Sequence, residues 1–261
     1  MKNLVRGIVF ASMVTISISL AAQTPTTAPT PATPPAAAAA PAVDPALTAD
    51  DIVNKHVAAI GGKDVLSKVK TESLEGTFSM MGTENPTNIT IVDGVGYKSE
   101  VEFNGAKIVQ CFTDKGGWMI NPMAGAATAT PMPDDAYNIG KDQIYVGDPL
   151  YNYADKGSKV ELLSKDGTAY KIKLTTKEKV EQTYLIDSTT FLVTSVASKG
   201  KMQDQDVDIT TKLSDYRKTD LGLTEPYAID VDLGGQFQIS IAIKKVELNK
   251  TIDPAVFAMP K

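Results

Sequence analysis

The sequence predicts a mainly β protein of the α+β class, in which a strongly curved antiparallel sheet forms an incomplete β-barrel with covering helices. From Glu72 onward, most of the chain alternates apolar and polar residues with a period of two. Tight-turn pairs such as Asp93-Gly94 and Asp166-Gly167 separate these runs. We count about ten strands in this pattern, at the spacing expected of a sheet that curls on itself.

The first 46 residues are expected to lie outside the folded body. Residues 1–22 combine two cations with a short apolar stretch and small residues, which is typical of a cleaved signal peptide. Residues 23–46 are rich in Pro, Ala and Thr, and proline at this density favours an extended, disordered linker. The chain is therefore predicted to be exported, with residues 47–261 as its folded domain.

Two segments of this domain predict helices. Thr48 can cap a helix whose apolar residues recur at helical spacing as far as Ile60, and Gly61-Gly62 would end it. Residues 121–133 predict a mobile loop, and residues 134–153 predict one or two short helices. Helices inserted into a series of strands usually cover one face or one mouth of the sheet. This arrangement indicates a cavity.

Composition excludes several classes of function. The formal charge is −5, from 26 basic and 31 acidic side chains, whereas a nucleic-acid-binding protein needs a basic face. The single cysteine cannot form an internal disulfide or a cysteine-based zinc cluster. The single histidine excludes mechanisms that need a histidine pair. Binding is therefore favoured over chemistry.

The remaining reactive side chains favour structural roles. His56 lies at the edge of the apolar stripe of the first helix, and Cys111 lies within a strand, as a core thiol would. Asp204, Asp206 and Asp208 share one face of a strand, but Ile209 stands where a calcium loop needs glycine. We predict no catalytic residues, no metal and no cofactor. An enzyme that uses His56 or the Asp206/Asp208 pair is the least favoured alternative.

The inward face of the predicted sheet supplies candidate ligand-binding residues. A larger curved sheet can enclose a cavity, and each methylene of an acyl chain buried there would contribute about 0.8 kcal/mol. The same apolar residues could instead form an ordinary filled core. The residues predicted to line a hydrophobic cavity are Phe78, Met80, Trp118, Ile144, Leu150, Tyr151, Tyr184, Phe237, Ile239, Ile241 and Ile243.

Several stretches of the chain resemble a known family. These are TADDIVNKHVAAIGGKDVLSKVKTESLEGTFSM at residues 48–80, KDQIYVGDPLYNYADKGSKVELL at residues 141–163 and VELNKTIDPAVFAMP at residues 246–260. They resemble periplasmic proteins of the outer-membrane lipoprotein-sorting superfamily, the LolA/LolB-like proteins, especially those of Bacteroidetes. The resemblance covers residues 48–260 through loose patterns.

The resemblance implies an incomplete barrel whose concave apolar face binds acyl chains without a cofactor. Residues 48–60 would form the first covering helix, and residues 134–153 would form a helical lid. Carriers of this kind hold the lid with a strand arginine. The chain after residue 22 has only Arg217, in a late segment, so such a latch cannot be assigned here.

The resemblance therefore implies a non-enzymatic periplasmic carrier of lipoprotein acyl chains or other lipids, involved in outer-membrane lipoprotein sorting. Its expected partners are these acyl chains and donor or acceptor proteins of the inner and outer membranes. No nucleic acid is expected, and the protein is expected to be a monomer. The alternative is a scaffolding module of the cell envelope, with a filled barrel and no lipid cargo.

Overall fold

The computed structural model describes residues 47–103, 105–122, 125–177, 179–202 and 205–260. The predicted signal peptide and linker, residues 1–46, lie outside the described residues, as does Met123 of the predicted loop. The helices are α1 (Ala49–Ala59), α2 (Lys63–Leu66), α3 (Asp134–Gly140), and the 3₁₀ helices η3 (Lys141–Ile144) and η4 (Pro254–Phe257). The strands are β1 (Thr71–Met80), β2 (Thr83–Val92), β3 (Gly96–Phe103), β4 (Ala106–Thr113), β5 (Gly116–Asn121), β6 (Ala126–Pro131), β7 (Lys159–Asp166), β8 (Ala169–Thr175), β9 (Glu181–Asp187), β10 (Val193–Met202), β11 (Gln205–Lys218), β12 (Thr224–Leu233) and β13 (Phe237–Leu248).

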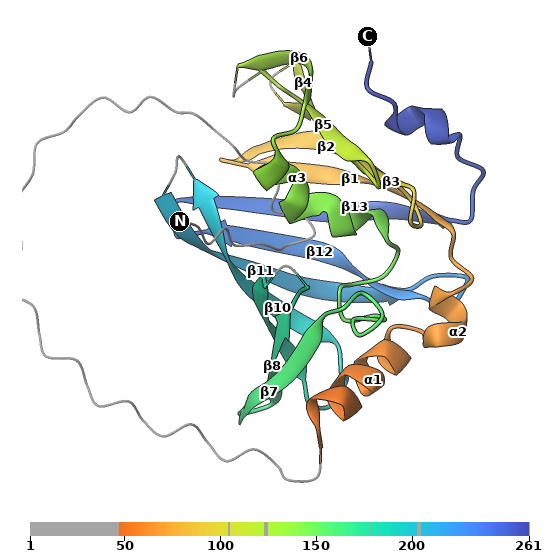
Figure 1. Ribbon diagram of the computed structural model, residues 1–261, viewed down its shortest axis with the longest axis vertical. Helices are drawn as coiled ribbons and strands as arrows, with labels where there is room; N and C mark the ends of the chain where they lie inside the picture. The colour runs from red at the N-terminus through yellow and green to blue at the C-terminus, as the bar shows by residue number, and fades with distance from the viewer. Residues whose placement is uncertain (1–46, 104, 123–124, 178, 203–204, 261) are drawn as a thin grey trace, which may run out of the picture.

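All these strands belong to one curved antiparallel sheet of thirteen strands (Figure 1). Strands β1 to β6 follow one another as neighbours, as do β7 to β13, and pairing of β1 with β13 joins the two halves. Strands β6 and β7 remain at the two ends of the order, so the sheet forms an open, incomplete barrel. The fold class predicted from the sequence is confirmed.

The loop predicted at residues 121–133 is wrong in part, because residues 126–131 form strand β6. This strand pairs only with β5, at the edge of the sheet. An edge strand needs one partner rather than two, and it tolerates proline at its margin, here Pro131. A segment of alanine and threonine can therefore join the sheet although it lacks the large apolar residues of a central strand.

A β-bulge between Glu75 and Gly76 bends the sheet where its two halves meet. A Cβ atom at Gly76 would lie 2.5 Å from the carbonyl oxygen of Ala242, so only glycine permits this approach of β1 to β13. On β13, Ile239, Ile241 and Ile243 are buried on the inward face, as the alternation in the sequence predicts.

The helical segments lie over the concave side of the sheet, with α1 and α2 near one end and α3 and η3 across its middle (Figure 1). Thr48 caps α1 through a reciprocal capping box with Asp51, which confirms the cap predicted from the sequence. Strands β2, β3 and β4 contact η3, and β7 contacts α1. No helix in the described ranges is long and apolar enough to cross a membrane.

Alternation along the strands divides the buried side chains into two clusters. The larger cluster fills the concave side, beneath the helices. The smaller cluster lies on the opposite, convex face and consists of Val109, Cys111, Trp118 and Phe257. We call it the convex cluster. Phe257 belongs to η4, so the C-terminal segment folds back over the outside of the sheet.

Candidate functional site

A cavity of about 170 Å³ lies between the concave face and the helical segments, and it is open to solvent on one side. Its apolar wall comes mainly from the strands. That wall includes Ile60, Leu74, Ile91, Val193, Val196, Leu213, Leu223, Ile229 and Ile243. The cavity also has an unusual number of polar side chains: His56, Glu72, Tyr97, Gln143, Tyr145, Asp148, Gln182, Tyr184, Thr211, Tyr216 and Glu225.

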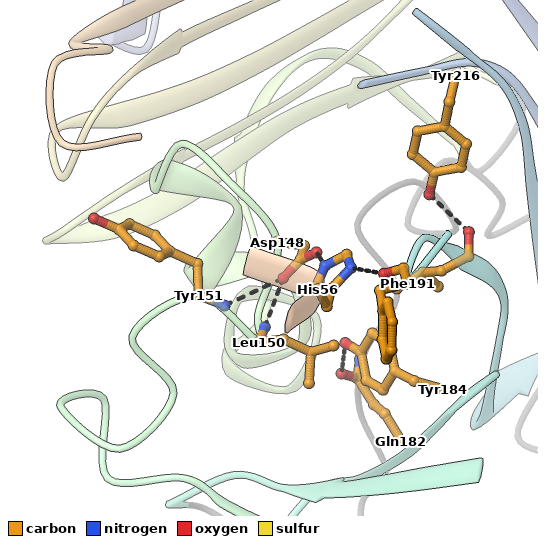
Figure 2. A network of polar contacts seen from close by, with 9 residues as sticks. His56, Asp148, Leu150, Tyr151, Gln182, Tyr184, Phe191 and Tyr216 are labelled. Atoms are coloured by element: carbon orange, nitrogen blue, oxygen red, sulfur yellow. Dashed lines mark hydrogen bonds and ion pairs between the residues drawn. The ribbon is translucent and has the colours of Figure 1, made fainter. Parts of the chain in front are cut away.

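The only histidine of the chain lines this cavity and is almost completely buried, with 1% of its surface exposed. Its Nδ1 lies 2.8 Å from the carbonyl oxygen of Phe191, and its Nε2 lies 2.5 Å from Oδ2 of Asp148 (Figure 2). A carbonyl oxygen only accepts hydrogen bonds, so Nδ1 carries a proton. Because the carboxylate also accepts, both ring nitrogens of His56 act as donors, and the ring is a cation.

The electrostatics of this pair agree with that geometry. Burial by itself lowers the pKa of His56, but the charge of Asp148 and the hydrogen bonds to Asp148 and Phe191 outweigh it, so the pKa is raised above its ordinary value of 6.5. Burial likewise raises the pKa of Asp148. The charge and hydrogen bond of His56 outweigh that effect, so this pKa is lowered. The two side chains form an ion pair near neutral pH.

The loops that carry the partners of His56 are held in place locally. Asp148 accepts hydrogen bonds through Oδ1 from the backbone N–H groups of Leu150 at 2.8 Å and Tyr151 at 3.2 Å (Figure 2). Phe191 adopts a left-handed backbone conformation with φ of 56°. Its ring stacks on Tyr170, with 6.1 Å between the ring centroids. His56 thus connects α1 to the segment after η3 and to the loop between β9 and β10.

Two tyrosines that line the cavity, the buried Tyr184 and the half-buried Tyr216, have their hydrogen-bond partners within the sheet. Tyr184 donates to Oε1 of Gln182 at 2.6 Å, and Tyr216 donates to the carbonyl oxygen of Val193 at 2.7 Å (Figure 2). Burial raises the pKa of both hydroxyl groups, with a smaller contribution from the charge of Asp148. Both tyrosines therefore remain neutral and are not available as bases.

A pair of carboxyl groups, Glu72 of β1 and Glu225 of β12, lies elsewhere on the cavity wall. Burial, the charge of Glu225 and a hydrogen bond to Glu225 raise the pKa of Glu72 well above its ordinary value. Burial raises the pKa of Glu225 to about 7, although the hydrogen bond from Glu72 opposes this. The two groups therefore share a proton at neutral pH, with Glu72 as the protonated member.

Some polar atoms of the cavity wall lack a hydrogen-bond partner. These atoms are Nε2 of Gln143, Oγ1 of Thr211 and Oε2 of Glu225. Gln143 is 7% exposed and Thr211 is 2% exposed, so the protein shields them from bulk water. Buried polar atoms without partners are uncommon in folded proteins, and they suit the binding of a ligand that supplies those partners.

Neither His56 nor Cys111 is placed to act as a base or a nucleophile. Both nitrogens of His56 are occupied, so the imidazole cannot act as a base without breaking an existing bond. Cys111 is buried on the convex face, where burial raises the pKa of its thiol to about 12. Within the described residues, no group of three or more His, Cys, Asp or Glu side chains could hold a metal ion.

The structure places the predicted cavity residues in four positions, three of them on the concave side and one, that of Trp118, on the convex face. Tyr184 and Ile243 line the cavity. A second set is buried in the larger cluster, in the sheet, in η3 or in the turn that follows it, without lining the cavity: Phe78, Met80, Ile144, Leu150, Ile239 and Ile241. Tyr151 and Phe237 pack against that cluster and are partly exposed.

Trp118, which the sequence places in the cavity, instead lies on the convex face. Its Nε1 donates to the carbonyl oxygen of Phe257 at 2.8 Å. Trp118 pairs across the sheet with Cys111, so both side chains point away from the cavity. Gly116 and Gly117 precede it in β5 and carry no side chains that would mark the two faces in the sequence.

The arginine and the aspartates considered from the sequence as functional residues lie on the surface wherever the structure describes them. Arg217 is exposed, forms an ion pair with Asp215 and lies over the ring of Tyr227. Asp206 and Asp208 are exposed, and Asp208 pairs with Lys199. Asp204 lies outside the described residues.

Sequence reasoning missed the polar side of the cavity, which includes Glu72, Asp148 and Glu225. A signal for Glu72 was present, because it shares the inward face of its strand with Leu74 and Phe78. A carboxyl group on an apolar face of a strand indicates a buried acid. Glu225 and Asp148 carried no comparable signal, since each lies next to a proline near a turn.

No protein-family model and no curated protein matches the sequence. Solved structures do match the fold. A LolA superfamily protein from Nitrosomonas europaea is 10% identical, with a TM-score of 0.55, over 82% of this chain and 98% of that one. The chain has the LolA-like fold.

A second solved structure agrees with this assignment. It is a domain described as an outer membrane lipoprotein-sorting protein, from Vibrio parahaemolyticus. It is 9% identical, with a TM-score of 0.52, over 79% of this chain and 94% of that one. The LolA-like resemblance predicted from the sequence is confirmed at the level of the fold.

Proposed function

We propose that this protein is a non-enzymatic carrier that binds the acyl chains of lipids or lipoproteins in the bacterial periplasm. The observation that carries the proposal is the LolA-like architecture: an open sheet whose concave apolar face is covered by helical segments with a cavity beneath them. Lipoprotein sorting at the outer membrane is the corresponding process, and donor and acceptor proteins of the two membranes are the proposed partners.

The size of the cavity requires that the helical cover moves during uptake. An apolar cavity of about 150 Å³ holds one benzene molecule. The cavity here is about 170 Å³, which leaves room for a head group or a few methylenes but not for a whole acyl chain. In the proposed mechanism α1 and the segment from α3 to Asp148 leave the concave face. The acyl chain then contacts Phe78, Ile239 and Ile241 in their place.

Such an exchange keeps apolar surface buried in both states. The helices cover the concave face when no cargo is bound, and the acyl chain covers it otherwise. The net affinity is therefore a small difference between two large terms, which suits a protein that must both take up and release its cargo. The hydrogen bond of His56 to the carbonyl oxygen of Phe191 is the proposed closing contact, since it joins α1 to the loop between β9 and β10. The ion pair of His56 with Asp148 links the segment that follows η3 to the same point.

Substitutions that introduce a charge on one or the other face of β13 test the proposal. Ile241→Asp places a charge on the concave face, whereas Ala242→Asp places one on the exposed face at the next residue. Uptake of a fluorescent fatty-acyl lipid should be lost in Ile241→Asp and retained in Ala242→Asp. Circular dichroism shows whether each variant folds. Normal uptake by a folded Ile241→Asp variant would contradict the proposal.

A second candidate function is a scaffolding module of the cell envelope that carries no lipid. The observation in its favour is that side chains already fill most of the concave side, with Ile52, Leu150 and Ile186 fully buried. Uptake experiments with wild-type protein separate the two functions. A scaffold would take up no lipid at any concentration that leaves vesicles intact.

A further inference from the structure

Within the part of the chain that the structure describes, the carboxyl pair of the cavity has no cationic partner. Among the described residues, no lysine or arginine forms an ion pair with Glu72 or Glu225, although several exposed acids of this chain have such partners. His56, the cation of the cavity, is already paired with Asp148. The Glu72–Glu225 pair therefore shares its proton beside a largely apolar space without a lysine or arginine to balance its charge.

The lid supplies an independent sign that a ligand belongs here. Gln143 of η3 lines the same cavity, is 7% exposed, and its Nε2 has no hydrogen-bond partner. Its amide can present either its oxygen or its nitrogen, because the two ends are related by a simple flip. Oε2 of Glu225 also lacks a partner. Unpartnered groups thus line the cavity from both the sheet and the lid.

Shape and charge restrict the ligand that would complete these groups. The apolar wall beside Glu72 includes Leu74, Ile91 and Ile243, which suits a hydrocarbon chain. Oε2 of Glu225 is an acceptor without a partner, and a carboxylate or phosphate head would be repelled by the charge that the pair carries when it loses its shared proton. A primary ammonium group carries three donors and a positive charge, so it can bind this oxygen and take the place of the proton that the two carboxyl groups share.

We propose that the cavity binds an amphiphile through a primary ammonium head, held between Glu72 and Glu225, with its hydrocarbon chain along the wall formed by Leu74, Ile91 and Ile243. This inference rests on the proposed carrier function, since it names the head group of the cargo. It excludes free fatty acids as the preferred ligand of this site.

Three probes that share the same hydrocarbon length and differ only in their head group test the proposal. Octylamine, octanol and octanoate are titrated into the full folded chain by isothermal calorimetry at neutral pH. Octylamine should bind most tightly, at least about tenfold more tightly than octanol, and octanoate should bind most weakly. Equal affinities for all three, or a preference for octanoate, would overturn the head-group proposal and leave the carrier function intact.

Variants test how much the carboxyl pair, as distinct from the rest of the cavity, contributes to the affinity for octylamine. Glu225→Gln keeps the shape of the side chain and removes its charge, so octylamine affinity should fall about tenfold while octanol affinity changes little. Glu102→Gln, an exposed acid on β3, is the matched control and should change neither affinity. Unchanged octylamine affinity in Glu225→Gln would overturn the proposal. Failure of wild-type protein to bind any of the three probes or any acyl lipid would overturn the carrier function itself.

Discussion

The two faces of the sheet differ in whether their buried polar groups have hydrogen-bond partners. On the convex face, Trp118 and Cys111 both donate to the carbonyl oxygen of Phe257. The ring of Phe257 lies so close to Gly96 that a Cβ atom there would be 2.6 Å from it. On the concave face, Gln143 and Glu225 keep polar atoms without partners beside a cavity.

This difference distinguishes a face whose buried groups only stabilise the fold from a face whose buried groups are available to bind a ligand. In the convex cluster, the side-chain donors of Trp118 and Cys111 are satisfied by the C-terminal segment, as expected of a contact that only stabilises the fold. The concave face retains space, unpartnered polar atoms and a buried ion pair, all of which cost stability unless something binds there. The comparison predicts that changes on the convex face affect stability alone, whereas changes on the concave face also affect binding.

Phe257→Ala should have the largest effect on stability. The ring is 3% exposed and packs against Gly96, so its loss should destabilise the protein by about 3–5 kcal/mol. Urea denaturation measures this change. Val256→Ala, at a side chain that is 38% exposed, is the control and should change stability by less than about 0.5 kcal/mol. A loss below about 1 kcal/mol in Phe257→Ala would show that the convex cluster does not anchor the C-terminal segment.

Asp148→Ala should have a smaller effect on stability and an additional effect on the lid. Removing the carboxylate leaves the buried His56 without its ion-pair partner, and the expected cost is about 2 kcal/mol. The cost is below that of a fully buried pair because the Asp148 side chain is 28% exposed. Hydrogen exchange at the amide of Leu150 should accelerate, since it donates to the side chain of Asp148. The amide of Tyr151 should change less, because it also donates to the backbone carbonyl of residue 148, which alanine retains.

The exposed Asp155 provides a control for this change within the same segment. Asp155→Ala should leave both stability and exchange unchanged. Equal exchange rates in the wild type and Asp148→Ala would contradict the role of the ion pair in holding the lid.

The melting temperature should fall by roughly 5 °C as the pH rises from 6 to 8.5. The folded protein raises the pKa of His56 above 6.5 and that of Glu225 to about 7, so both groups bind their protons more tightly than in the unfolded chain. Their contributions are present at low pH and are lost as the pH rises through the folded pKa values. Glu72 has a raised pKa and adds to the loss at higher pH.

Thermal melts of variants assign this pH dependence to its sources. Glu225→Gln and His56→Gln should each flatten the curve, and the two changes together should remove most of the slope. Asp148 is the charged partner of His56, and the charge of Lys156 acts in turn on Asp148. A melting temperature that is constant or increases between pH 6 and 8.5 would contradict the protonation states derived from the geometry.

Thr48→Ala should have the smallest effect, at about 1 kcal/mol. The Thr48 side chain accepts from the backbone N–H of Asp51 at 3.1 Å and begins α1, which carries His56 to the cavity. Thr48→Ser keeps the hydroxyl group and should restore stability in chemical denaturation. If serine and alanine are equally destabilising, the capping bond does not contribute.

The features predicted correctly from the sequence are those that repeat locally. The period of two located the strands, and the signals around Thr48 and Gly61 located α1. Trp118 was assigned to the wrong face because Gly116 and Gly117 interrupt the alternation. Strand β6 was missed because an edge strand needs little β propensity.

The polar side of the cavity depends on contacts that no local pattern contains. His56 and Asp148 are 92 residues apart in the sequence, and His56 and Phe191 are 135 residues apart. Glu72 and Glu225 meet only because β1 and β12 both pair with β13. Sequence analysis could identify a concave apolar face, whereas the carboxyl pair and the ion pair beside it appear only once the sheet is assembled.

The most direct test of the central claim is native mass spectrometry of the protein, exported with its own N-terminal segment and purified without detergent. The account predicts additional mass from a bound lipid or acylated molecule, which is released on denaturation and can then be identified. A bare protein mass, combined with no uptake of added lipid, would contradict the carrier function and favour a scaffold with a filled barrel.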